Sequence, residues 1–541
     1  MIALAIVTAS LLLIAAQVCT PNDNWPYTRG QKIGIALAYL GGYPLLVGWG
    51  LMGRLSRKHS IAIVLALLVF SLGLLRYLPY SNDDAFIFFR YAANIVDHGE
   101  AAYNPGQRVE GYTSTAWVAL LTLARWLGFD VLFASKAMGI ILGMGILFFT
   151  YCCAVRVSGN QSAAFLTTVT LAASQLLQSW VPSGMDVALF VCWQMGLLAL
   201  LLSGAPGGWV LTAVSAFGFW VRPEALLVNA AVWLDVLYRC RRHGRPLPLG
   251  VLACTAISGV LPLGIRYWYF GDMFPNTYYA KSFLTALDGI SYIGSAFHYF
   301  GWALTSAGMA GCVLLAPSAP VFLILVLFYL AYFVAVGGDI LSFRFALFLF
   351  PILLIGVGYL LATATRRGWR LAFGAVLFAL TIAHTTGVYQ HLTIRENSSN
   401  QRGHLYVPGN SRGTFETDFL AGQYLAENAS AEDWLATDNI GAVGYLSKLR
   451  VLDFYGLVSR EVAQAVHRHD GSVRLTLLEE YRRRQPRWVL CYGVVTPNPP
   501  RCGLEPVGDI AEFLQGSYER VNAWRSFTGY YRILLRRIDS G

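Results

Sequence analysis

The sequence predicts an α-helical polytopic membrane protein of about 13 spans, with a C-terminal α/β domain outside the membrane. Of its 541 residues, 56% are hydrophobic and only 13% are charged, which is too little polar surface for a soluble chain of this size. Apolar runs of about twenty residues recur along most of the chain. The last part, about 392–541, is polar and alternates strand-like with helix-like segments.

Each long apolar run is interpreted as one transmembrane helix. The runs lie at about 2–19, 33–52, 61–79, 132–154, 162–181, 184–203, 207–221, 224–238, 248–269, 301–316, 320–336, 345–364 and 370–390. The first run lacks a basic n-region and a small-residue cleavage site, so we expect a retained span. The predicted domains are 1–60 with two additional spans, 61–391 as the transmembrane core with a first outer loop at 80–130, and 392–541 as a soluble domain.

Three basic clusters give the expected orientation, because basic loops stay in the cytoplasm. They are Arg54, Arg57 and Lys58; Arg239, Arg241, Arg242 and Arg245; and Arg366, Arg367 and Arg370. An even number of spans must separate any two clusters. Six clear spans lie between the first two, so the ambiguous apolar segment 113–129 is predicted to lie along the outer membrane face. The polar segments 81–130, 182–186, 222–224, 271–300, 337–339 and the tail then share that outer face.

The formal net charge of +10 fits basic cytoplasmic loops first and an anionic substrate or lipid second. No basic patch lies on a soluble helix, so nucleic acid is not an expected partner. Seven of the nine cysteines fall in or beside apolar runs, where cysteine behaves as a small hydrophobic residue. Cys491 and Cys502 lie in the polar tail and are a candidate disulfide if that tail is outside the cytosol.

The stretch SNDDAFIFFRYA at 81–92 places two adjacent carboxylates, Asp83 and Asp84, just after an apolar run. The apolar residues that follow recur at helical spacing: Phe86, Phe89, Ala93 and Val96. The pattern predicts an amphipathic interfacial helix whose N-terminal N–H groups the two acids could cap. On the structural interpretation the acids are a solvated cap. On the functional one they are a general base or metal ligands beside an apolar wall.

A second polar motif, NPGQRVEGYTSTAW, occupies 104–117. Pro105 and Gly106 predict a turn, and Thr113, Ser114 and Thr115 can cap the helix that follows. The functional interpretation is a sugar or phosphate platform. Its candidate residues are Tyr112 or Trp117 for an aromatic face, Arg108 for an anion contact, and Glu110 as the opposite charge.

These two stretches together resemble the first extracytoplasmic loop of GT-C glycosyltransferases. They are most similar to the polyprenyl-phosphate-arabinose-dependent arabinofuranosyltransferases that add terminal β-(1→2) arabinofuranose in mycobacterial cell walls. Later segments resemble the same family in order: PSGMDVALF at 182–190, VRPEALL, PNTYYAKS, GGDILSFRF, and the outer-domain stretch at 438–463. The resemblance runs from about residue 61 to 465, and the first two spans lie outside it.

The resemblance implies transfer of a sugar from a polyprenyl-phosphate donor to an acceptor hydroxyl on a glycan or protein. It places the enzyme in the cytoplasmic (inner) membrane, among membrane lipids, with its site and C-terminal domain on the periplasmic side. Asp83 or Asp84 is implied as the base. Asp186 is implied as a second carboxylate, where the family often has Glu.

The donor phosphate requires cations at the membrane interface, and Arg222, Lys281 and Arg344 are the outer-face candidates. Arg222 and Arg344 are equally explained as interfacial snorkelling residues, and Glu224 as a structural partner of Arg222. Lys281 lies among the polar aromatic neighbours of NTYYAKS, which favours the functional interpretation there. The full predicted substrate-binding set is Arg108, Glu110, Tyr112, Thr113, Ser114, Trp117, Arg222, Asn276, Tyr279, Lys281, Asp339 and Arg344.

Several alternatives stay open. A mannosyl- or aminoarabinosyl-type transferase would show a similar acid pair, and a polyprenyl-glycan transporter would instead need ionisable residues buried in mid-span. No cofactor is certain, although the two adjacent Asp residues could hold Mg²⁺, Mn²⁺ or Ca²⁺. If donor and product are both β-configured, retention requires either a carboxylate nucleophile or front-face attack within an ion pair.

Overall fold

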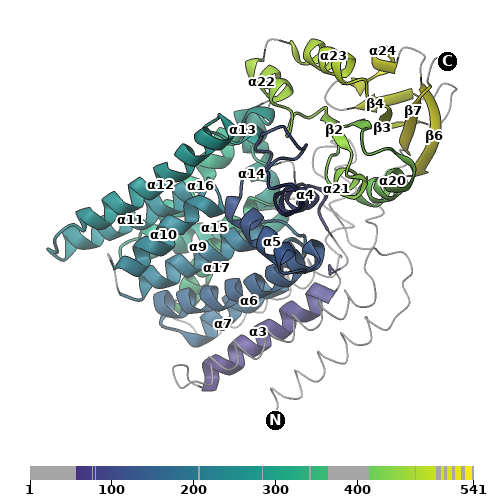
Figure 1. Cartoon of the computed structure of the whole chain (residues 1–541). Coiled ribbons are helices and arrows are strands. Elements are labelled where there is room, and N and C mark those ends of the chain that lie inside the picture. The colour runs from purple at the N-terminus through teal and green to yellow at the C-terminus, as the bar shows by residue number, and fades with distance from the viewer. Residues whose placement is uncertain are drawn as a thin grey trace. The chain divides into compact units, whose positions relative to one another are not determined.

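The structure is a computed structural model that describes most of the chain. The described residues are 57–75, 77–78, 81–204, 208–282, 284–339, 341, 343–363, 414–469, 471–494, 501–504, 508–514, 518–525 and 531–538. The predicted spans at 2–19, 33–52 and 370–390 lie outside the described residues. The chain divides into two compact units (Figure 1). Unit 1 comprises Met1–Tyr80, Phe133–Val260 and Thr285–Leu405, and unit 2 comprises Ser81–Leu132, Leu261–Leu284 and Tyr406–Gly541.

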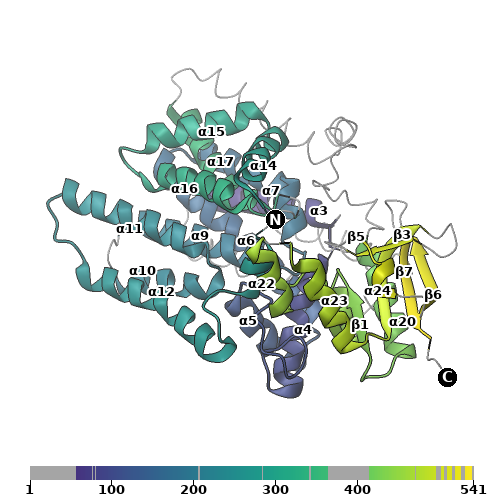
Figure 2. The same cartoon turned by 90° about the horizontal axis from the view of Figure 1, so that it is seen from above.

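Unit 1 is helical over its described residues (Figure 2). Its helices are α3 (Arg57–Leu75), α6 (Val131–Ser158), α7 (Gln161–Ala173), α8 (Gln175–Trp180), α9 (Val187–Leu202), α10 (Trp209–Val221), α11 (Ala225–Arg242), the first part of α12 (Leu249–Phe270), α14 (Ala286–Phe300), α15 (Trp302–Leu315), α16 (Val321–Val336) and α17 (Ala346–Thr363). The predicted span at 162–181 is two helices, because Ser174 ends α7 and its side chain accepts from the Leu177 N–H to cap α8.

The helices α6, α12 and α17 are long and apolar enough to cross a membrane, by length and composition. Shorter apolar helices occur at Ile61–Leu74, Val187–Leu202, Trp209–Val221, Trp302–Leu315 and Val321–Val336. The ambiguous segment 113–129 forms α5 (Thr115–Trp126). Its 12 residues rise only about 18 Å, well short of a hydrocarbon layer about 30 Å thick. This length agrees with a helix that does not cross, and the count of 13 spans stays a prediction.

Close helix packing in unit 1 depends on glycine where α15 meets α17. A Cβ added at Gly311 would overlap the backbone of Gly356 on α17, and one added at Gly308 would press on the backbone of Leu353. Small residues let two helix backbones approach this closely, and this approach supplies packing contacts that lipid cannot replace. The pair therefore fixes the spacing of two apolar helices.

Unit 2 brings together three segments that are far apart in the sequence. The first outer loop supplies α4 (Asp83–His98) and α5. The segment 261–284, here called the second loop, supplies the end of α12 and α13 (Asn276–Ala280). The C-terminal segment supplies the α/β domain. The segment 81–130, the first half of 271–300 and the described part of the tail, which were predicted to share one face, are therefore parts of one compact unit.

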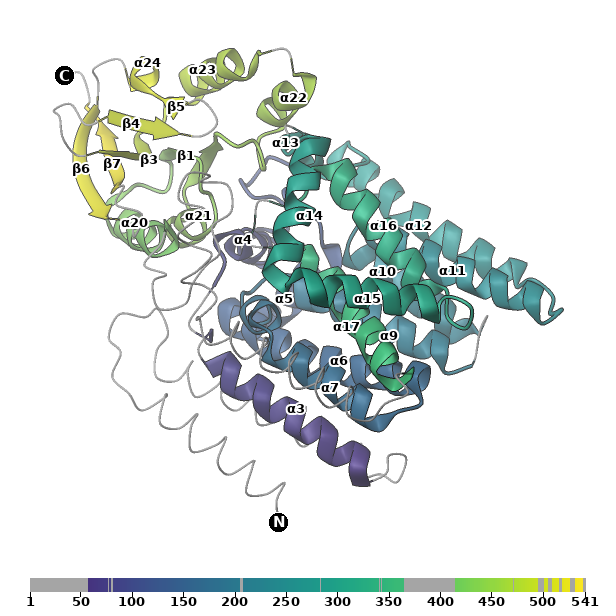
Figure 3. The same ribbon diagram turned by 180° about the vertical axis from the view of Figure 1, so that it is seen from behind.

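The C-terminal domain is a sheet with helices on both faces (Figures 1 and 3). Its strands are β1 (Trp434–Thr437), β2 (Arg450–Asp453), β3 (Trp488–Val494), β4 (Arg501–Leu504), β5 (Gly508–Asp509), β6 (Tyr518–Arg525) and β7 (Tyr531–Arg537). The order is β2-β1-β3-β4-β5, with β7 paired to β3 and β6 paired to β7. Strands β2, β1 and β3 are parallel.

Helices α20 (Thr414–Asn428) and α21 (Ala442–Ser447) cover one face of the sheet. Helices α22 (Arg460–Arg468), α23 (Val473–Arg484) and α24 (Ala511–Leu514) cover the other. Successive strand residues point to opposite faces, so Ala436 joins the core under α22 and α23 while its buried neighbour Leu435 faces the other side.

We expect Gly311→Ala to lower the free energy of unfolding by about 1–3 kcal/mol, because the new methyl group meets backbone that cannot rotate away. Gly294→Ala on α14 is the matched control, since a Cβ there meets nothing within 4 Å. It should be neutral or gain up to about 1 kcal/mol from helix propensity. Thermal unfolding of both variants in one detergent measures the difference, and equal melting temperatures would contradict the packing account.

Candidate active site

The acid pair opens α4, but neither acid caps that helix as predicted. The N-cap is Asn82, whose side-chain oxygen accepts from the Asp84 N–H at 2.9 Å. Asn82 has the extended backbone (φ −82, ψ 141) that a cap requires, whereas Asp83 and Asp84 are already helical. The capping prediction is therefore wrong by one residue, and the two carboxylates are free for other partners.

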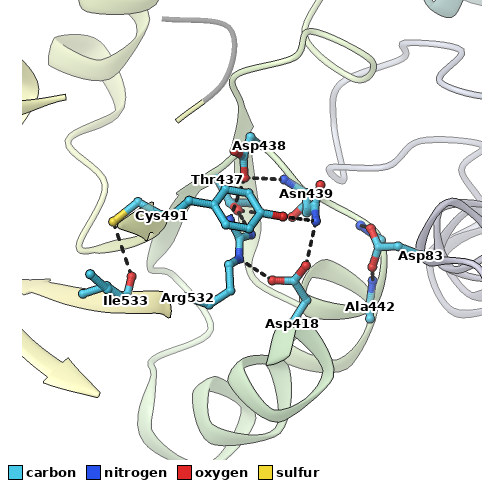
Figure 4. A network of polar contacts seen from close by, with 11 residues as sticks. Asp83, Asp418, Thr437, Asp438, Asn439, Ala442, Cys491, Arg532 and Ile533 are labelled. Atoms are coloured by element: carbon cyan, nitrogen blue, oxygen red, sulfur yellow. Dashed lines mark hydrogen bonds and ion pairs between the residues drawn. The ribbon is translucent and has the colours of Figure 1, made fainter. Parts of the chain in front are cut away.

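Asp83 caps a different helix, α21 in the C-terminal domain. Its Oδ2 accepts from the Gly441 N–H at 3.0 Å and its Oδ1 from the Ala442 N–H at 2.8 Å (Figure 4). Burial raises the pKa of Asp83 to about 7; the nearby negative charge of Asp418 also raises it, and the two N–H groups lower it. Both oxygens of this carboxylate are occupied by backbone donors.

The Asp84 carboxylate differs from the Asp83 carboxylate in its hydrogen-bond partners. Its side chain is half-buried, and no described residue donates a hydrogen bond to its carboxylate. Adjacent helical residues point about 100° apart, so Asp84 projects away from the face that Asp83 presents to α21. Of the two acids, Asp84 is the one with oxygens available for a substrate.

Arg90 is a buried arginine that we did not predict as a site residue. It is only 4% exposed and donates to three carbonyl oxygens, those of Tyr103 at 2.8 Å, Gly444 at 2.7 Å and Leu449 at 2.6 Å. Its guanidinium also lies 4.1 Å from the centroid of the Tyr103 ring. Burial lowers the pKa of Arg90, and the carbonyls and the ring take the place of a counter-ion.

The NPGQRVEGYTSTAW motif is also largely structural. Gly106 has a φ of +84 in the predicted turn, and the Ser114 side chain caps α5 by accepting from the Trp117 N–H at 3.2 Å. Trp117 is fully buried and Tyr112 is 5% exposed, with its ring edge-to-face on Tyr91 at 4.7 Å. Neither ring presents an open face, so the aromatic platform predicted for these two residues is not formed in this structure.

Glu110 pairs with Arg266, not with Arg108. The Arg266 Nε lies 3.1 and 3.0 Å from the two Glu110 oxygens, and both side chains are buried. Burial raises the pKa of Glu110 to about 7, against the lowering effect of Arg266. Arg108 is exposed and rests 4.9 Å from the centroid of the Tyr269 ring. Its guanidinium makes no hydrogen bond or ion pair with any described residue, so it is an available cation.

The second loop, at 261–284, contributes the hydrogen bonds of Asn276 and a ring contact of Tyr279. Asn276 is buried and donates from its side chain to the carbonyls of Gly456 and Leu457 at 2.5 and 3.1 Å. Its backbone N–H donates to the Glu110 carbonyl at 2.8 Å. Tyr279 packs edge-to-face on His467 at 5.3 Å. Lys281 and Thr113 are half-buried. Asn276 therefore joins the second loop to the first loop and to the C-terminal domain.

In unit 1, Asp186 joins a buried ionic cluster. Its Oδ2 accepts from Arg222 at 2.7 Å, and Arg222 also makes two 3.0 Å bonds to Glu224, confirming the predicted Arg222–Glu224 pair. Tyr332 donates to Glu224 at 3.0 Å. The Oδ1 of Asp186 is buried without a hydrogen-bond partner among the described residues. The cluster thus carries two carboxylates for one guanidinium, with one carboxylate oxygen unused.

Asp339 and Arg344 form a separate pair in unit 1. The Arg344 Nε and Nη2 donate to the two Asp339 oxygens at 3.0 and 2.9 Å, and both side chains are nearly buried. A bidentate pair of this kind is strong, and it orients the guanidinium. Lys136 on α6 is a further buried cation that the sequence did not single out; it donates to the carbonyls of Leu78 and Pro182 at 3.0 and 2.8 Å.

Behind Asp83 lies a second buried network in the C-terminal domain (Figure 4). Arg532 pairs with Asp418 at 2.6 Å and with Asp438 at 2.8 Å, and Asn439 donates to Asp418 at 2.8 Å. Asp438 and Asn439 directly follow β1, at the carboxyl edge of the parallel strands. Ligands of open α/β sheets bind at this edge, but here protein side chains occupy it.

The described side chains test neither the predicted disulfide nor the predicted metal site. Cys491 is disulfide-bonded, and the side chain of Cys502 lies outside the described side chains, so their pairing stays a prediction. No group of three or more His, Cys, Asp or Glu residues that could hold a metal occurs among the described residues. A divalent ion between Asp83 and Asp84 would have to displace the amide donors from Asp83. Metal dependence stays a prediction.

Two curated proteins that share one name are similar in sequence to this chain. The chain is 28% identical over 221 residues to a terminal β-(1→2)-arabinofuranosyltransferase of Mycobacterium tuberculosis, covering 37% of this chain and 34% of the relative. It is 25% identical over 366 residues to the enzyme of the same name from Corynebacterium glutamicum, covering 57% and 52%. The chain therefore spans about a third to a half of the length of these curated relatives. The sequence resemblance to arabinofuranosyltransferases is confirmed.

The solved structure of ArnT from Cupriavidus metallidurans bound to undecaprenyl phosphate matches the fold. The TM-score is 0.53 at 12% identity, covering 89% of this chain and 98% of that one. The chain has the GT-C fold. It is a membrane protein, with the apolar helices and the C-terminal sheet region that the sequence predicts for that fold. A domain-family model described as a domain of unknown function (DUF8728) matches residues 410–536, which is the C-terminal domain of this GT-C chain.

We expect the stability of unit 2 to fall as pH rises from about 5 to 8. Asp83, Glu110 and Asp453 each have a pKa raised to about 7, mainly by burial, so the folded state holds protons that the unfolded state has lost. Stability is then fully present below the ordinary carboxyl pKa and is lost as pH rises through about 7. Chemical unfolding followed by tryptophan fluorescence across this range measures the slope.

Glu110→Gln, which mimics the protonated acid, should make this slope shallower. Glu427→Gln is the matched control, because Glu427 is exposed on α20 and should leave the slope unchanged. Stability that rises with pH in the wild-type protein would contradict the assignment of these raised pKa values.

Proposed function

We propose that this chain is a glycosyltransferase that moves a sugar, D-arabinofuranose, from a polyprenyl-phosphate donor to an acceptor hydroxyl on a glycan or glycoprotein. The reaction takes place at the outer face of the cytoplasmic membrane. The similarity to two enzymes named terminal β-(1→2)-arabinofuranosyltransferase supports the sugar. The fold of ArnT, whose solved structure holds undecaprenyl phosphate, supports a lipid-linked donor.

One geometric observation carries the assignment of the base. Asp83 has both oxygens occupied by the Gly441 and Ala442 N–H groups, whereas Asp84 accepts no hydrogen bond from a described residue. A general base must accept a proton from the attacking hydroxyl within hydrogen-bond reach. We therefore assign this step to Asp84 and a positioning role to Asp83.

The proposed transfer forms one bond at the anomeric carbon and breaks another. The acceptor oxygen forms a bond to the anomeric carbon, the bond from that carbon to the phosphate oxygen breaks, and polyprenyl phosphate leaves with the electron pair. The proton of the acceptor hydroxyl passes to Asp84. If the β configuration is retained, a carboxylate nucleophile or a front-face ion pair is needed. Asp186 is the second carboxylate proposed for the reaction, because its Oδ1 has no partner among the described residues.

Arg108 is the proposed phosphate contact of unit 2. It is exposed and makes no ion pair with a described residue, unlike Arg90 and Arg266, whose guanidinium groups are buried against protein partners. In unit 1, Arg222 and Arg344 are already paired with carboxylates, so a phosphate would have to compete for them. An unpaired guanidinium binds a phosphate without that competition.

Asp84→Asn should lower kcat for arabinose transfer by about 10²–10⁴-fold, the usual contribution of a general base, without changing the melting temperature. Asp97→Asn is the matched control, because Asp97 is the last acid of the same helix and forms an exposed pair with Arg125. The assay uses purified protein in lipid nanodiscs with polyprenyl-phosphoarabinose and, as comparison donors, the mannose and aminoarabinose analogues. Equal rates for Asp84→Asn and Asp97→Asn would remove the proposed base.

Arg108→Gln should raise KM for the donor by about 10–100-fold, the loss of one charge-assisted hydrogen bond, with little change in kcat. Arg520→Gln, another exposed arginine of unit 2, is the control and should leave both constants unchanged. A lower kcat at unchanged KM would contradict a phosphate contact at Arg108. A transporter would move labelled lipid between leaflets in the same nanodisc lipids reconstituted as vesicles, without forming a new glycosidic bond.

A further inference from the structure

We propose that the C-terminal α/β domain, most of which matches the family model of unknown function, is a positioning module whose helix α21 holds α4 and thereby orients Asp84. The consequence for catalysis rests on the proposed function. The holding itself rests on contacts within unit 2.

The spacing of two side chains on α4 matches the length of α21. Asp83 and Arg90 are seven residues apart, so they lie on one face of α4 about 10.5 Å apart along its axis. Helix α21 has six residues and is about 9 Å long. Asp83 accepts from the amides of Gly441 and Ala442 at its start. Arg90 donates to the carbonyl of Gly444 in its last turn and to that of Leu449, two residues past its end.

The charges of Asp83 and Arg90 match the polarity of α21. A helix has partial positive charge at its N-terminal amides and partial negative charge at its C-terminal carbonyls. The carboxylate of Asp83 lies at the first and the guanidinium of Arg90 at the second. Between them, the rings of Phe86 and Phe89 lie edge-on to Tyr445 of α21, with centroids 5.7 and 6.0 Å away. The alignment of α4 on α21 is therefore specified at both ends and in the middle.

The loop after α4 extends the attachment to the edge of the sheet. Asn104 donates to the Val451 carbonyl and accepts from the Val451 N–H, both at 2.9 Å, as a neighbouring strand would. Val451 lies on β2, the edge strand of the sheet. The Tyr103 hydroxyl donates to the Ile440 carbonyl, one residue before the amides that Asp83 binds. These contacts cover free backbone groups that would otherwise need water.

Two glycines, the N-cap Gly441 and Gly444 within α21, allow the close approach of the first loop. A Cβ at Gly441 would overlap the backbone carbonyl of Asp83, and a Cβ at Gly444 would overlap the Tyr103 hydroxyl. Neither glycine has a positive φ, so close approach and not backbone conformation explains them. The surface of the domain at α21 is thus shaped to receive this loop.

A double-mutant test follows from the Gly444 contact. Gly444→Ala should push Tyr103 away, raise the hydrogen exchange of a peptide spanning 438–449, and lower kcat by at least about tenfold. Tyr103→Phe removes the atom that the new methyl group meets. After its removal the nearest atoms, Tyr103 Cζ and Arg90 Nη1, are both 3.1 Å away, a tight contact that a small shift relieves.

The double variant Gly444→Ala/Tyr103→Phe should therefore recover most of the exchange protection and of kcat, while Tyr103→Phe alone changes kcat less than about threefold. Gly422→Ala is the matched control, because a Cβ there presses on α21 from α20 and not from the first loop. Adding Tyr103→Phe to Gly422→Ala should restore nothing. All variants are measured as the full chain in nanodiscs, with kcat normalised to the folded fraction.

The outcomes separate the two proposals. Wild-type protein that transfers no sugar from any donor overturns the proposed function, while the exchange measurements still decide whether the loop is held on α21. Unchanged exchange in Gly444→Ala overturns the positioning module. Raised exchange with unchanged kcat shows that α21 holds the loop without orienting the base, and this result also overturns the proposal.

Discussion

The arrangement of unit 2 depends on one constraint, which is that backbone groups of the C-terminal domain must find their partners in side chains of a distant loop. Asp83 binds amides 358 and 359 residues away, and Arg90 binds carbonyls 354 and 359 residues away. Buried N–H and C=O groups without partners are costly, so the domain and the loop each complete the other. The three segments of unit 2 are consequently one folding unit, and neither the loop nor the domain is a separate appendage.

Buried arginines are stabilised in two different ways among the described residues. Arg90 has no acidic partner among its described contacts and relies on three carbonyls and an aromatic ring. Arg532 and Arg222 each pair with two carboxylates, which leaves a net negative charge in both networks. The planar guanidinium with five donors suits each of these sites, and a lysine could not make the same set of bonds. In unit 2 the excess of acid near Asp83 is one cause of its raised pKa.

The sequence predicts helices, caps and ion pairs where the residues involved are close together in the chain. Apolar runs predicted most of the described helices of unit 1, although α14 lies in the segment 271–300 that was predicted to be polar. The run Thr113–Thr115 predicted the start of α5, and the charge pattern predicted the Arg222–Glu224 pair. It was uninformative about partners across long separations. The motif residues Arg90, Asn104 and Asn276 look like substrate ligands until Gly444, Val451 and Gly456 are known to lie beside them. The burial of Trp117 likewise follows from packing that no spacing reveals.

Under the proposed function, the two adjacent acids at the start of α4 have separate roles because the helix turns them apart. Asp83 faces α21 and is held by amides; Asp84, about 100° further round, shares its rigid backbone but not its partners. A base on a loop would need its own supporting contacts, and these contacts would occupy the oxygens that must accept a proton. Placing the support on the preceding residue separates the two requirements. One carboxylate can be fully hydrogen-bonded, while the next stays open and is still held in place by the helix.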